Sequence, residues 1–279
     1  MMQYVWAHDQ LTPQEEAGVH LQDRGYYFGD GIYEVIRLYD GKPFLWDEHF
    51  ERFARSAAEL DLPFPKPLEH IMQDMLTLIE ANHVHNGIIY LQMTRGVQER
   101  NHLYSRDMIP VITAFTKEED VPSHLQEEGI TLWAVEDIRW LRCDIKTINL
   151  LGNVMAKRSA EDNGCHEALL HRGHTVTEGS STNVFMVQNG VIYTHPADNY
   201  ILKGITRQFI QKLCIEKGIP FEETAFTLED LQDADELFIA STSHEIVPVN
   251  HVSGTMEKTL PSRSLTDQLQ QSFQERKLS

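Results

Sequence analysis

The chain has 279 residues, of which 41% are hydrophobic and 24% charged, values typical of a globular protein with one large domain or two smaller ones. Its formal net charge of −18, from 42 acidic and 24 basic residues, argues against nucleic acid or an anionic membrane surface as a partner. A small anionic ligand is not excluded, because a few local cations can form a positive pocket inside an acidic shell.

The cysteines and the apolar runs indicate the compartment. Cys143, Cys165 and Cys214 are odd in number and widely spaced, a pattern typical of free thiols in a reducing environment. The first residues lack the basic segment and the long apolar core of a signal peptide. No apolar run approaches the roughly 18 residues of a membrane span. We therefore expect a cytoplasmic protein.

The first half of the chain is predicted to combine hairpins with two helices. A turn-rich loop over 23–31 comes first, Asp40-Gly41 is a typical hairpin turn, and Asp47 is a plausible N-cap. The segment 95–107 is polar and irregular. Strands are predicted over residues 3–7, 32–39, 42–45, 87–94 and 109–115, and helices over 47–60 and 68–83.

The segment 117–124 carries charge, a proline and a serine without any period, and it is the predicted linker. It divides the chain into a smaller N-terminal domain, 1–120, and a larger C-terminal domain, 121–279. Strands outnumber helices and come in hairpins, so we predict an α+β fold with mixed sheets rather than a doubly wound one. In the second domain, strands are predicted over 130–135, 167–171, 183–187, 191–193 and 236–240, and helices over 149–162, 206–217, 228–231 and 262–277.

Lys146 is the first candidate for chemistry. Its neighbours Ile145, Thr147 and Ile148 are β-branched, which favours a strand or tight turn with the lysine side chain directed into the protein. A buried ammonium is costly unless its pKa falls or its charge is consumed. Forming an imine with an aldehyde does both. The alternative is a solvated lysine at the edge of a loop.

Glu178 lies in the polar segment 177–183, which leads into an apolar strand. A pyridoxal ring withdraws electrons only while its ring nitrogen is protonated, and a nearby carboxylate keeps it so. Glu178 is a candidate for that carboxylate. The alternative is a turn carboxylate in water, and neither Lys146 nor Glu178 is strong evidence alone.

Two segments have the composition of phosphate cradles. Residues 202–207 place Gly204 and Thr206 at the start of a helix, where free N–H groups and the positive end of the helix dipole favour a phosphate. Residues 241–244 follow a strand and supply hydroxyls. Arg52, on a predicted helix, is a further candidate to neutralise a phosphate. The alternatives are an ordinary N-cap, a Ser/Thr turn and a solvated cation.

Arg100 and His102 are two residues apart in the irregular segment, so their side chains project the same way from an extended chain. Such a pair is suited to clamp a carboxylate, because arginine offers a bidentate fork. The alternative is a solvated loop.

Neither a metal site nor a dinucleotide site is predicted. Gly29-Asp30-Gly31 is only half of a dinucleotide fingerprint, since the third glycine position holds Glu34 and a strand follows instead of a helix. No group of histidines has ligand spacing on a helix with a nearby acid. The histidines considered are His83 with His85, His166 with His171 and His174, and His195.

Together these segments resemble the fold-type IV family of pyridoxal-phosphate enzymes, and within it they are most similar to bacterial D-amino-acid aminotransferases. The lysine segment and the Glu-Gly-Ser-Ser segment are specific in combination. The Arg-x-His pair separates the D-amino-acid enzymes from their branched-chain relatives. The similar segments are 23–35, 48–56, 90–102, 135–151, 176–185, 202–207 and 236–249.

The resemblance implies a homodimer of two-domain subunits, with pyridoxal 5′-phosphate between the domains and the larger domain binding it. Lys146 would form the Schiff base and carry the proton, and Glu178 would pair with the ring nitrogen. The Arg100–His102 loop would come from the other subunit. The implied cofactor-binding residues are Arg52, Lys146, Glu178, Ser180, Ser181, Leu202, Gly204, Ile205, Thr206, Ser241 and Thr242. The implied substrate-binding residues are Tyr33, Arg100, His102, Ser181 and Thr242.

The implied reaction is transamination between a D-amino acid such as D-alanine and a 2-oxo acid such as 2-oxoglutarate, giving pyruvate and D-glutamate. A branched-chain L-amino-acid aminotransferase and an aminodeoxychorismate lyase are alternatives on the same fold, and a carrier or regulator without turnover is a third. Three departures from the family pattern bear on substrate range: His244 replaces a serine, Asn153 replaces a small residue, and Tyr27 replaces a glutamine.

Overall fold

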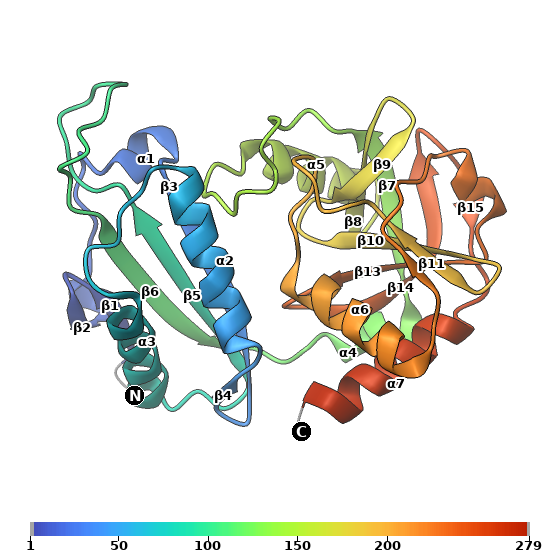
Figure 1. The fold of residues 1–279 in the computed structure, drawn as a ribbon, viewed down its shortest axis with the longest axis horizontal. Helices are drawn as coiled ribbons and strands as arrows, with labels where there is room; N and C mark the ends of the chain where they lie inside the picture. The colour runs from blue at the N-terminus through green and yellow to red at the C-terminus, as the bar shows by residue number, and fades with distance from the viewer. Residues whose placement is uncertain (1–2, 278–279) are drawn as a thin grey trace. The chain divides into compact units, whose positions relative to one another are not determined.

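The computed structural model describes residues 3–277, which form two compact units (Figure 1). The first unit comprises the chain up to Asp120 together with Ile145–Asn149. The second comprises Val121–Asp144 and the chain from Leu150 onward. The predicted domain division therefore needs a correction at 145–149, because these residues bond to the first unit, where Thr147 bridges Ile32.

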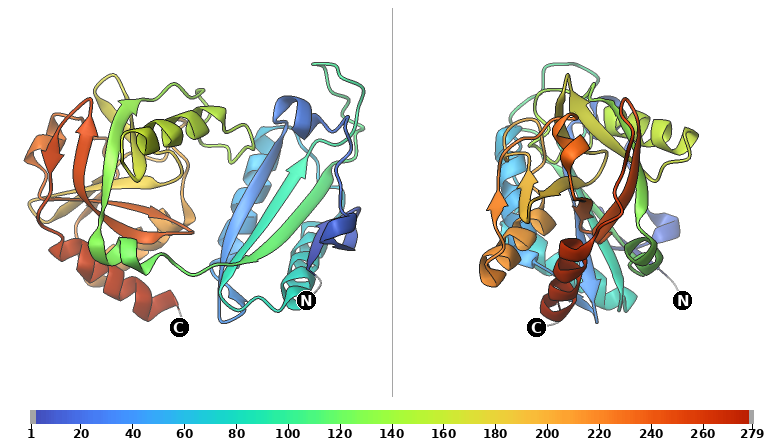
Figure 2. Two further views of the ribbon diagram at one scale, coloured as in Figure 1. Left: turned by 180° about the vertical axis from the view of Figure 1, so that it is seen from behind. Right: turned by 90° about the vertical axis from the view of Figure 1, so that its right-hand side faces the viewer.

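The first unit is built on a six-stranded sheet in the order β2-β1-β6-β5-β3-β4, with every neighbouring pair antiparallel. Helices α2 and α3 lie on one face of this sheet, and the view from behind shows the strands in front of them (Figure 2). The elements are β1 (Tyr4–Ala7), β2 (Gln10–Pro13), the 3-10 turn Gln14–Glu16, α1 (Arg24–Phe28), β3 (Gly31–Tyr39), β4 (Lys42–Pro43), α2 (Trp46–Glu59), α3 (Leu68–Asn82), β5 (Gly87–Thr94) and β6 (Val111–Glu118).

Strand β3 shows why the two helices pack where they do. Ile32, Ile36 and Leu38 are buried in the core that α2 and α3 cover. Tyr33 and Val35 are only half-buried, because alternate side chains of a strand project to opposite faces. One face of the sheet thus forms the core, and the other face carries Tyr33.

The structure differs from two of the local predictions in this unit. The predicted loop over 23–31 contains the short helix α1, which Asp23 caps by accepting from the N–H of Gly25 and which ends at Gly29 with a φ of 65°. Asp47 lies in the first turn of α2, not at its N-cap, because Leu45 occupies the cap position with a φ of 53°.

The second unit is built on a nine-stranded mixed sheet. The main path is β12-β11-β10-β13-β14-β7-β8-β9, and β15 pairs with β14. The pairs β11–β12, β14–β7 and β7–β8 are parallel. The elements are α4 (Ser123–Glu128), β7 (Ile130–Glu136), α5 (Leu151–Asp162), β8 (Glu167–Arg172), β9 (Thr175–Gly179), β10 (Asn183–Gln188), β11 (Val191–Thr194), α6 (Ile205–Lys217), β12 (Phe221–Glu222), the 3-10 turn Asp230–Asp233, β13 (Glu236–Ser241), β14 (Glu245–Gly254), β15 (Lys258–Thr259) and α7 (Ser264–Lys277).

The predicted α+β fold with mixed sheets is confirmed, but five of the described strands were missed: the short strands β2, β12 and β15, and the longer strands β9 and β14. β14 lies at the centre of the second sheet, and its Pro248 and polar His251 hid it, since proline normally argues against a central strand. β9 includes Glu178, which was expected in a polar loop. The predicted linker 117–124 overlaps the end of β6 and the start of α4.

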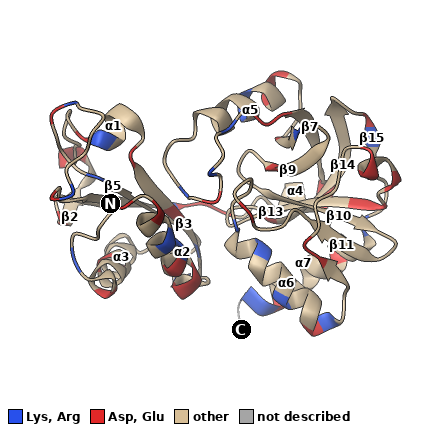
Figure 3. Ribbon diagram, turned by 45° about the horizontal axis from the view of Figure 1, so that its top comes forward, with Lys and Arg blue, Asp and Glu red and all other residues tan. Residues whose placement is uncertain are grey.

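Acidic positions occur on helices, strands and loops of each unit (Figure 3). Within residues 3–277, no helix is both long and apolar enough to span a membrane. The same part of the chain contains no group of three or more His, Cys, Asp or Glu side chains arranged to hold a metal ion.

Candidate active site

In the first unit, the backbone around Lys146 is fixed against the start of β3. The N–H of Tyr33 donates to the carbonyl of Lys146 at 3.0 Å, and the hydroxyl of Thr147 donates to the carbonyl of Gly31 at 3.0 Å. Ile145 is buried in the core of the unit. Lys146 is therefore held by backbone bonds although it lies outside any regular element, and it is half-buried, whereas its flanking residues predicted a side chain directed into the interior.

The structure brings together two residues that the sequence analysis selected separately. The ammonium of Lys146 lies 4.1 Å from the centroid of the Tyr33 ring, which stacks on Tyr90 at 5.6 Å. An ammonium over an aromatic face is attracted to it electrostatically. Tyr33 therefore holds the amine of Lys146 at the half-buried end of β3.

Arg52 forms a buried ion pair that the sequence did not reveal. Its Nε and Nη2 donate to the two carboxylate oxygens of Glu34 at 2.7 Å each, and Nδ1 of His49 lies 2.7 Å from the same carboxylate. Burial would raise the pKa of Glu34, but Arg52 and His49 together lower it to about 2. The sequence did contain one indication of this ion pair. Glu34 lies between Ile32 and Ile36 in the alternation of β3, so its acidic side chain projects from the buried face of the strand.

Arg100 and His102 are exposed, as is the rest of their immediate loop. The ring of Phe28 lies 5.4 Å from the ring of His102 and 5.2 Å from the guanidinium carbon of Arg100. The two candidate clamp residues therefore share one aromatic contact on α1, and they are accessible on the surface of the unit.

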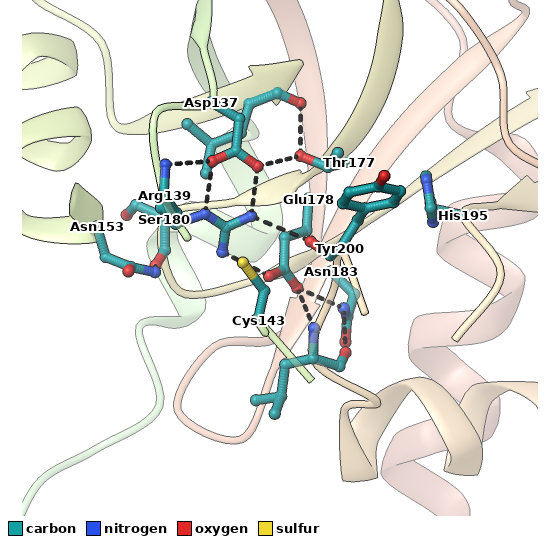
Figure 4. A network of polar contacts seen from close by, with 12 residues as sticks. Asp137, Arg139, Cys143, Asn153, Thr177, Glu178, Ser180, Asn183, His195 and Tyr200 are labelled. Carbon is teal, nitrogen blue, oxygen red and sulfur yellow. Dashed lines mark hydrogen bonds and ion pairs between the residues drawn. The ribbon is translucent and has the colours of Figure 1, made fainter. Parts of the chain in front are cut away.

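In the second unit, Glu178 is 5% exposed and three groups fix its carboxylate (Figure 4). Arg139 Nη1 donates to Oε1 at 2.7 Å, while Asn183 Nδ2 and the backbone N–H of Leu202 each donate to Oε2 at 3.1 Å. A carboxylate held in this way presents its remaining lone pairs in a fixed direction. It is suited to accept a hydrogen bond from a protonated ring nitrogen.

Arg139 joins Glu178 to a second buried acid. Its Nη2 donates to Asp137 Oδ2 at 2.8 Å, and Arg172 and the Thr177 hydroxyl donate to the same oxygen at 3.1 Å each. Burial raises the pKa of Glu178 to about 7, and the opposing charge of Arg139 keeps it from rising further. Arg139 lies in a segment that the sequence analysis selected, but its pairing with Glu178 could not be inferred from spacing.

The hydroxyls of Ser180 and Ser181 both donate to Glu167, at 2.5 and 3.2 Å. Asn153, one of the departures from the family pattern, donates from Nδ2 to the carbonyl of Ser180 at 2.7 Å. These contacts fix the turn that follows Glu178, and they explain how a polar side chain is accommodated at position 153.

The start of α6 has the features of an anion site. Its N-cap is Gly204, no side chain caps it, and no acid occupies its first turn. The N–H groups there have no partners within the helix, as at any helix N-terminus. A Cβ at Gly204 would lie 2.1 Å from Asn183 Oδ1, so only glycine allows Asn183 to reach both Glu178 and the Leu202 carbonyl. The N–H groups at the start of α6 are suited to bind a phosphate, and the carboxylate of Glu178, to which Asn183 and Leu202 donate, is suited to bind a ring nitrogen.

The other predicted cradle, residues 241–244, is ordered by its own side chains. Ser241 Oγ and Ser243 Oγ lie 3.1 and 3.0 Å from Nδ1 of His244, and the N–H of His244 donates to Ser241 Oγ. His244 therefore contacts a candidate phosphate ligand directly, which explains how a departure at this position can influence the site.

Known proteins resemble this chain over most of its length. The family model described as amino-transferase class IV matches residues 31–252. The chain is 49% identical over 273 residues to a D-alanine aminotransferase of Staphylococcus haemolyticus, covering 98% of this chain and 97% of that protein. It is 47% identical over 274 residues to the D-alanine aminotransferase of Staphylococcus aureus strain MSSA476, with the same coverage.

Among solved structures, the branched-chain amino acid aminotransferase of Escherichia coli superposes with a TM-score of 0.92 at 25% identity. The match covers 99% of this chain and 95% of that one.

Proposed function

Because this chain belongs to the class IV aminotransferase family, whose members use pyridoxal phosphate, we propose that it transfers amino groups between D-amino acids, such as D-alanine, and 2-oxo acids, such as 2-oxoglutarate. Pyruvate and D-glutamate would be the products. The full-length similarity to D-alanine aminotransferases, at close to half identity, confirms the prediction made from the sequence. The observation in this chain that carries the proposal is the buried carboxylate of Glu178, fixed by three donors.

Lys146 and Glu178 have complementary roles in this proposal. The bound cofactor supplies an electron sink for the carbon that loses or gains a proton. The amine of Lys146 attaches the cofactor and moves the proton to and from the substrate Cα. The carboxylate of Glu178 accepts a hydrogen bond from the protonated ring nitrogen, and so favours the charged form of the ring.

The phosphate of the cofactor is assigned to the anion-binding groups. The N–H groups of Ile205 and Thr206 at the start of α6, with Gly204 as cap, are its main donors. Ser180, Ser181 and Leu202 are also assigned to the cofactor. The two serine hydroxyls donate to Glu167, and the N–H of Leu202 donates to Glu178. Arg52, Ser241 and Thr242 complete the set.

The substrate carboxylate is assigned to Tyr33, Arg100 and His102, and Ser181 and Thr242 are assigned to the same substrate-binding set. Arg100 is the main candidate, because a guanidinium can donate two parallel hydrogen bonds to the two oxygens of a carboxylate. The contact between Tyr33 and Lys146 supports this assignment, since it keeps a substrate-binding ring next to the reacting amine.

A homodimer is the proposed assembly, with the Arg100–His102 loop of one subunit serving the site of the other. The exposure of both side chains supports this arrangement. Exposed hydrophobic side chains on the second unit also support an interface, since exposed apolar surface marks sites of association. Gly152 at the start of α5 lies against Arg139. The exposed hydrophobic residues that flank these two positions in the chain are Ile138, Trp140, Leu141, Leu151, Val154 and Met155.

The alternative enzymes on this fold are less favoured. Identity to the branched-chain aminotransferase of E. coli is 25%, about half of that to the D-alanine enzymes. An aminodeoxychorismate lyase would also need Lys146 and Glu178, but it transfers no amino group to an oxo acid. The cytoplasm is the proposed compartment.

The deciding experiment follows the amino group. The purified protein is loaded with pyridoxal phosphate and its visible spectrum is recorded before and after addition of D-alanine or L-alanine. With 2-oxoglutarate present, D-glutamate and pyruvate are then measured. We expect a spectral change with D-alanine, little with L-alanine, and equal amounts of the two products. A preference for L-alanine, or pyruvate without D-glutamate, would contradict the proposal.

A further inference from the structure

Arg24 is a buried arginine that is not itself assigned to bind the cofactor or the substrate. It lies at the start of α1 and is 4% exposed. Its Nε donates to Asp30 Oδ2 at 2.8 Å. Its Nη1 and Nη2 donate to the backbone carbonyls of Asn101 and His102, at 2.5 and 3.3 Å. The whole guanidinium is therefore engaged, and two of its three nitrogens hold the loop that carries the candidate clamp.

The same helix also holds the side chains of that loop. The guanidinium carbon of Arg24 lies 4.7 Å above the ring of Phe28. That ring in turn contacts His102 and Arg100, at 5.4 and 5.2 Å. One residue thus fixes the backbone between the two clamp residues while its stacking partner supports their side chains.

The loop needs such an anchor, because residues 99–103 form no regular element and are all exposed. An exposed loop without buried contacts samples many conformations, and a ligand pays for its ordering on binding. The local bond from Leu103 N–H to Asn101 Oδ1 shapes the turn but does not tie it to the unit.

Arg24 is not required to keep Asp30 paired. Arg95 Nε donates to the same carboxylate at 2.9 Å, and its other nitrogens donate to the carbonyls of Leu60 and Asp61. Loss of the Arg24 contacts therefore leaves Asp30 with a buried partner that is itself tied to the end of α2. Substitution at position 24 is expected to release the loop without unfolding the unit.

We propose that Arg24 is a positioning residue for substrate binding: it fixes the backbone of the Arg100–His102 loop so that this pair meets the substrate carboxylate already ordered. The inference rests on the proposed function, in which Arg100 and His102 bind that carboxylate. Lysine cannot replace arginine here, because a single ammonium cannot reach an acid and two carbonyls in a fixed fork.

The test compares Arg24→Lys with Arg106→Met in the loaded enzyme. Arg106 lies on the same loop, but its guanidinium pairs with Asp61 at the exposed far end. We expect Arg24→Lys to raise KM for D-alanine roughly 10- to 100-fold, the loss typical of charge-assisted contacts, with kcat changed much less. Preference for D- over L-alanine should fall, and pyridoxal-phosphate affinity and thermal stability should stay near wild type. Arg106→Met should leave KM within about twofold of the wild-type value.

Two further measurements separate positioning from a general loss of structure. Amide hydrogen exchange of residues 100–103 should become faster in Arg24→Lys and stay unchanged in Arg106→Met. In an Arg100→Ala background, Arg24→Lys should add little, because residues that act through one another are not additive. A wild-type KM in Arg24→Lys, or effects that simply multiply in the double variant, would overturn the inference. If Arg100→Ala alone left KM unchanged, the proposed clamp would fail instead.

Discussion

Arg139 Nη1 lies 2.7 Å from Glu178 Oε1, and each side chain is 6% exposed. The same guanidinium donates to Asp137, so one buried cation serves two buried acids (Figure 4). Asn183 Nδ2 and the N–H of Leu202 donate to the other oxygen, Oε2. The orientation of Glu178 therefore depends on a residue that the sequence analysis did not assign to cofactor or substrate binding.

Arg139→Met is expected to destabilise the protein strongly. Removing one partner of a buried ion pair costs about 3–5 kcal/mol, because the remaining charge stays buried without compensation. The pKa of Glu178 should rise above about 7, since the charge of Arg139 opposes the effect of burial. Urea unfolding measures the loss. The control is Arg158→Met, whose partner Asp162 is exposed, and it should change stability by no more than about 1 kcal/mol. Equal effects of the two substitutions would contradict the role of Arg139.

Glu178→Gln tests the pH dependence of the cofactor-free protein. Burial raises the pKa of Glu178 from its ordinary 4.5 to about 7. A raised pKa in the folded state means a contribution to stability that is fully present below pH 4.5 and is lost as the pH rises through about 7. The wild type should therefore lose about 3 kcal/mol relative to Glu178→Gln across this window, at 1.36 kcal/mol per pKa unit. Parallel stability curves for the two proteins would refute the raised pKa.

In the loaded enzyme, Glu178→Gln should retain the cofactor and lose turnover. A neutral amide no longer favours the protonated ring nitrogen, and loss of a charge-assisted hydrogen bond corresponds to roughly 10- to 100-fold in rate. Steady-state kinetics with D-alanine and 2-oxoglutarate measure the loss, and the absorbance of bound cofactor shows retention. Unchanged kcat would remove Glu178 from the site.

Lys146→Ala should abolish covalent attachment of the cofactor. Borohydride treatment of the wild type should leave the cofactor fixed to the peptide that contains Lys146, and the variant should show no such product by mass spectrometry. Turnover should fall at least about 100-fold, because proton transfer by a positioned side chain contributes about 10²–10⁴-fold. Small amines in the buffer should restore a little activity. Near-normal turnover would mean that another lysine attaches the cofactor.

Arg100→Ala should raise KM for D-alanine and weaken discrimination between the enantiomers, while the spectrum of the bound cofactor stays intact. In the proposed mechanism Lys146 would deliver its proton from one side only, so the direction of the carboxylate would decide which enantiomer presents its Cα hydrogen to the lysine. Losing the charge-assisted contact corresponds to roughly 10- to 100-fold in binding or rate. Initial rates with D- and L-alanine measure both effects, and a wild-type preference would exclude Arg100 from the clamp.

Mixed dimers test whether the Arg100–His102 loop serves the partner subunit. Lys146→Ala and Arg100→Ala subunits carry different tags, are unfolded and refolded together, and the mixed dimer is purified through both tags. If the loop acts across subunits, one site per mixed dimer has both intact residues, and a substantial part of wild-type activity returns. If the loop acts within its own subunit, no site has both residues, and the mixed dimer shows only the weakened activity and raised KM of the Arg100→Ala parent.

The sequence by itself determined which local segments are candidates for chemistry. Lys146 stands out because its β-branched neighbours predict a side chain directed into the protein, and the structure places Ile145 in the core and Tyr33 beside the amine. Residues 32–39 were predicted as a strand, and the structure buries Ile32, Ile36 and Leu38 on one face of it. These signals are local, because strand alternation and flanking residue types are set within a few positions of the chain.

Only the tertiary structure decided how these residues are held. The donors to Glu178 lie 39, 5 and 24 positions away, and Arg24 reaches carbonyls 77 and 78 positions along the chain. Such pairs depend on the order and register of strands, including β14, whose proline hid it from the sequence pattern. Because buried polar groups must find partners wherever the fold brings them, the identity of those partners is fixed by the packing of the sheets and not by spacing in the chain.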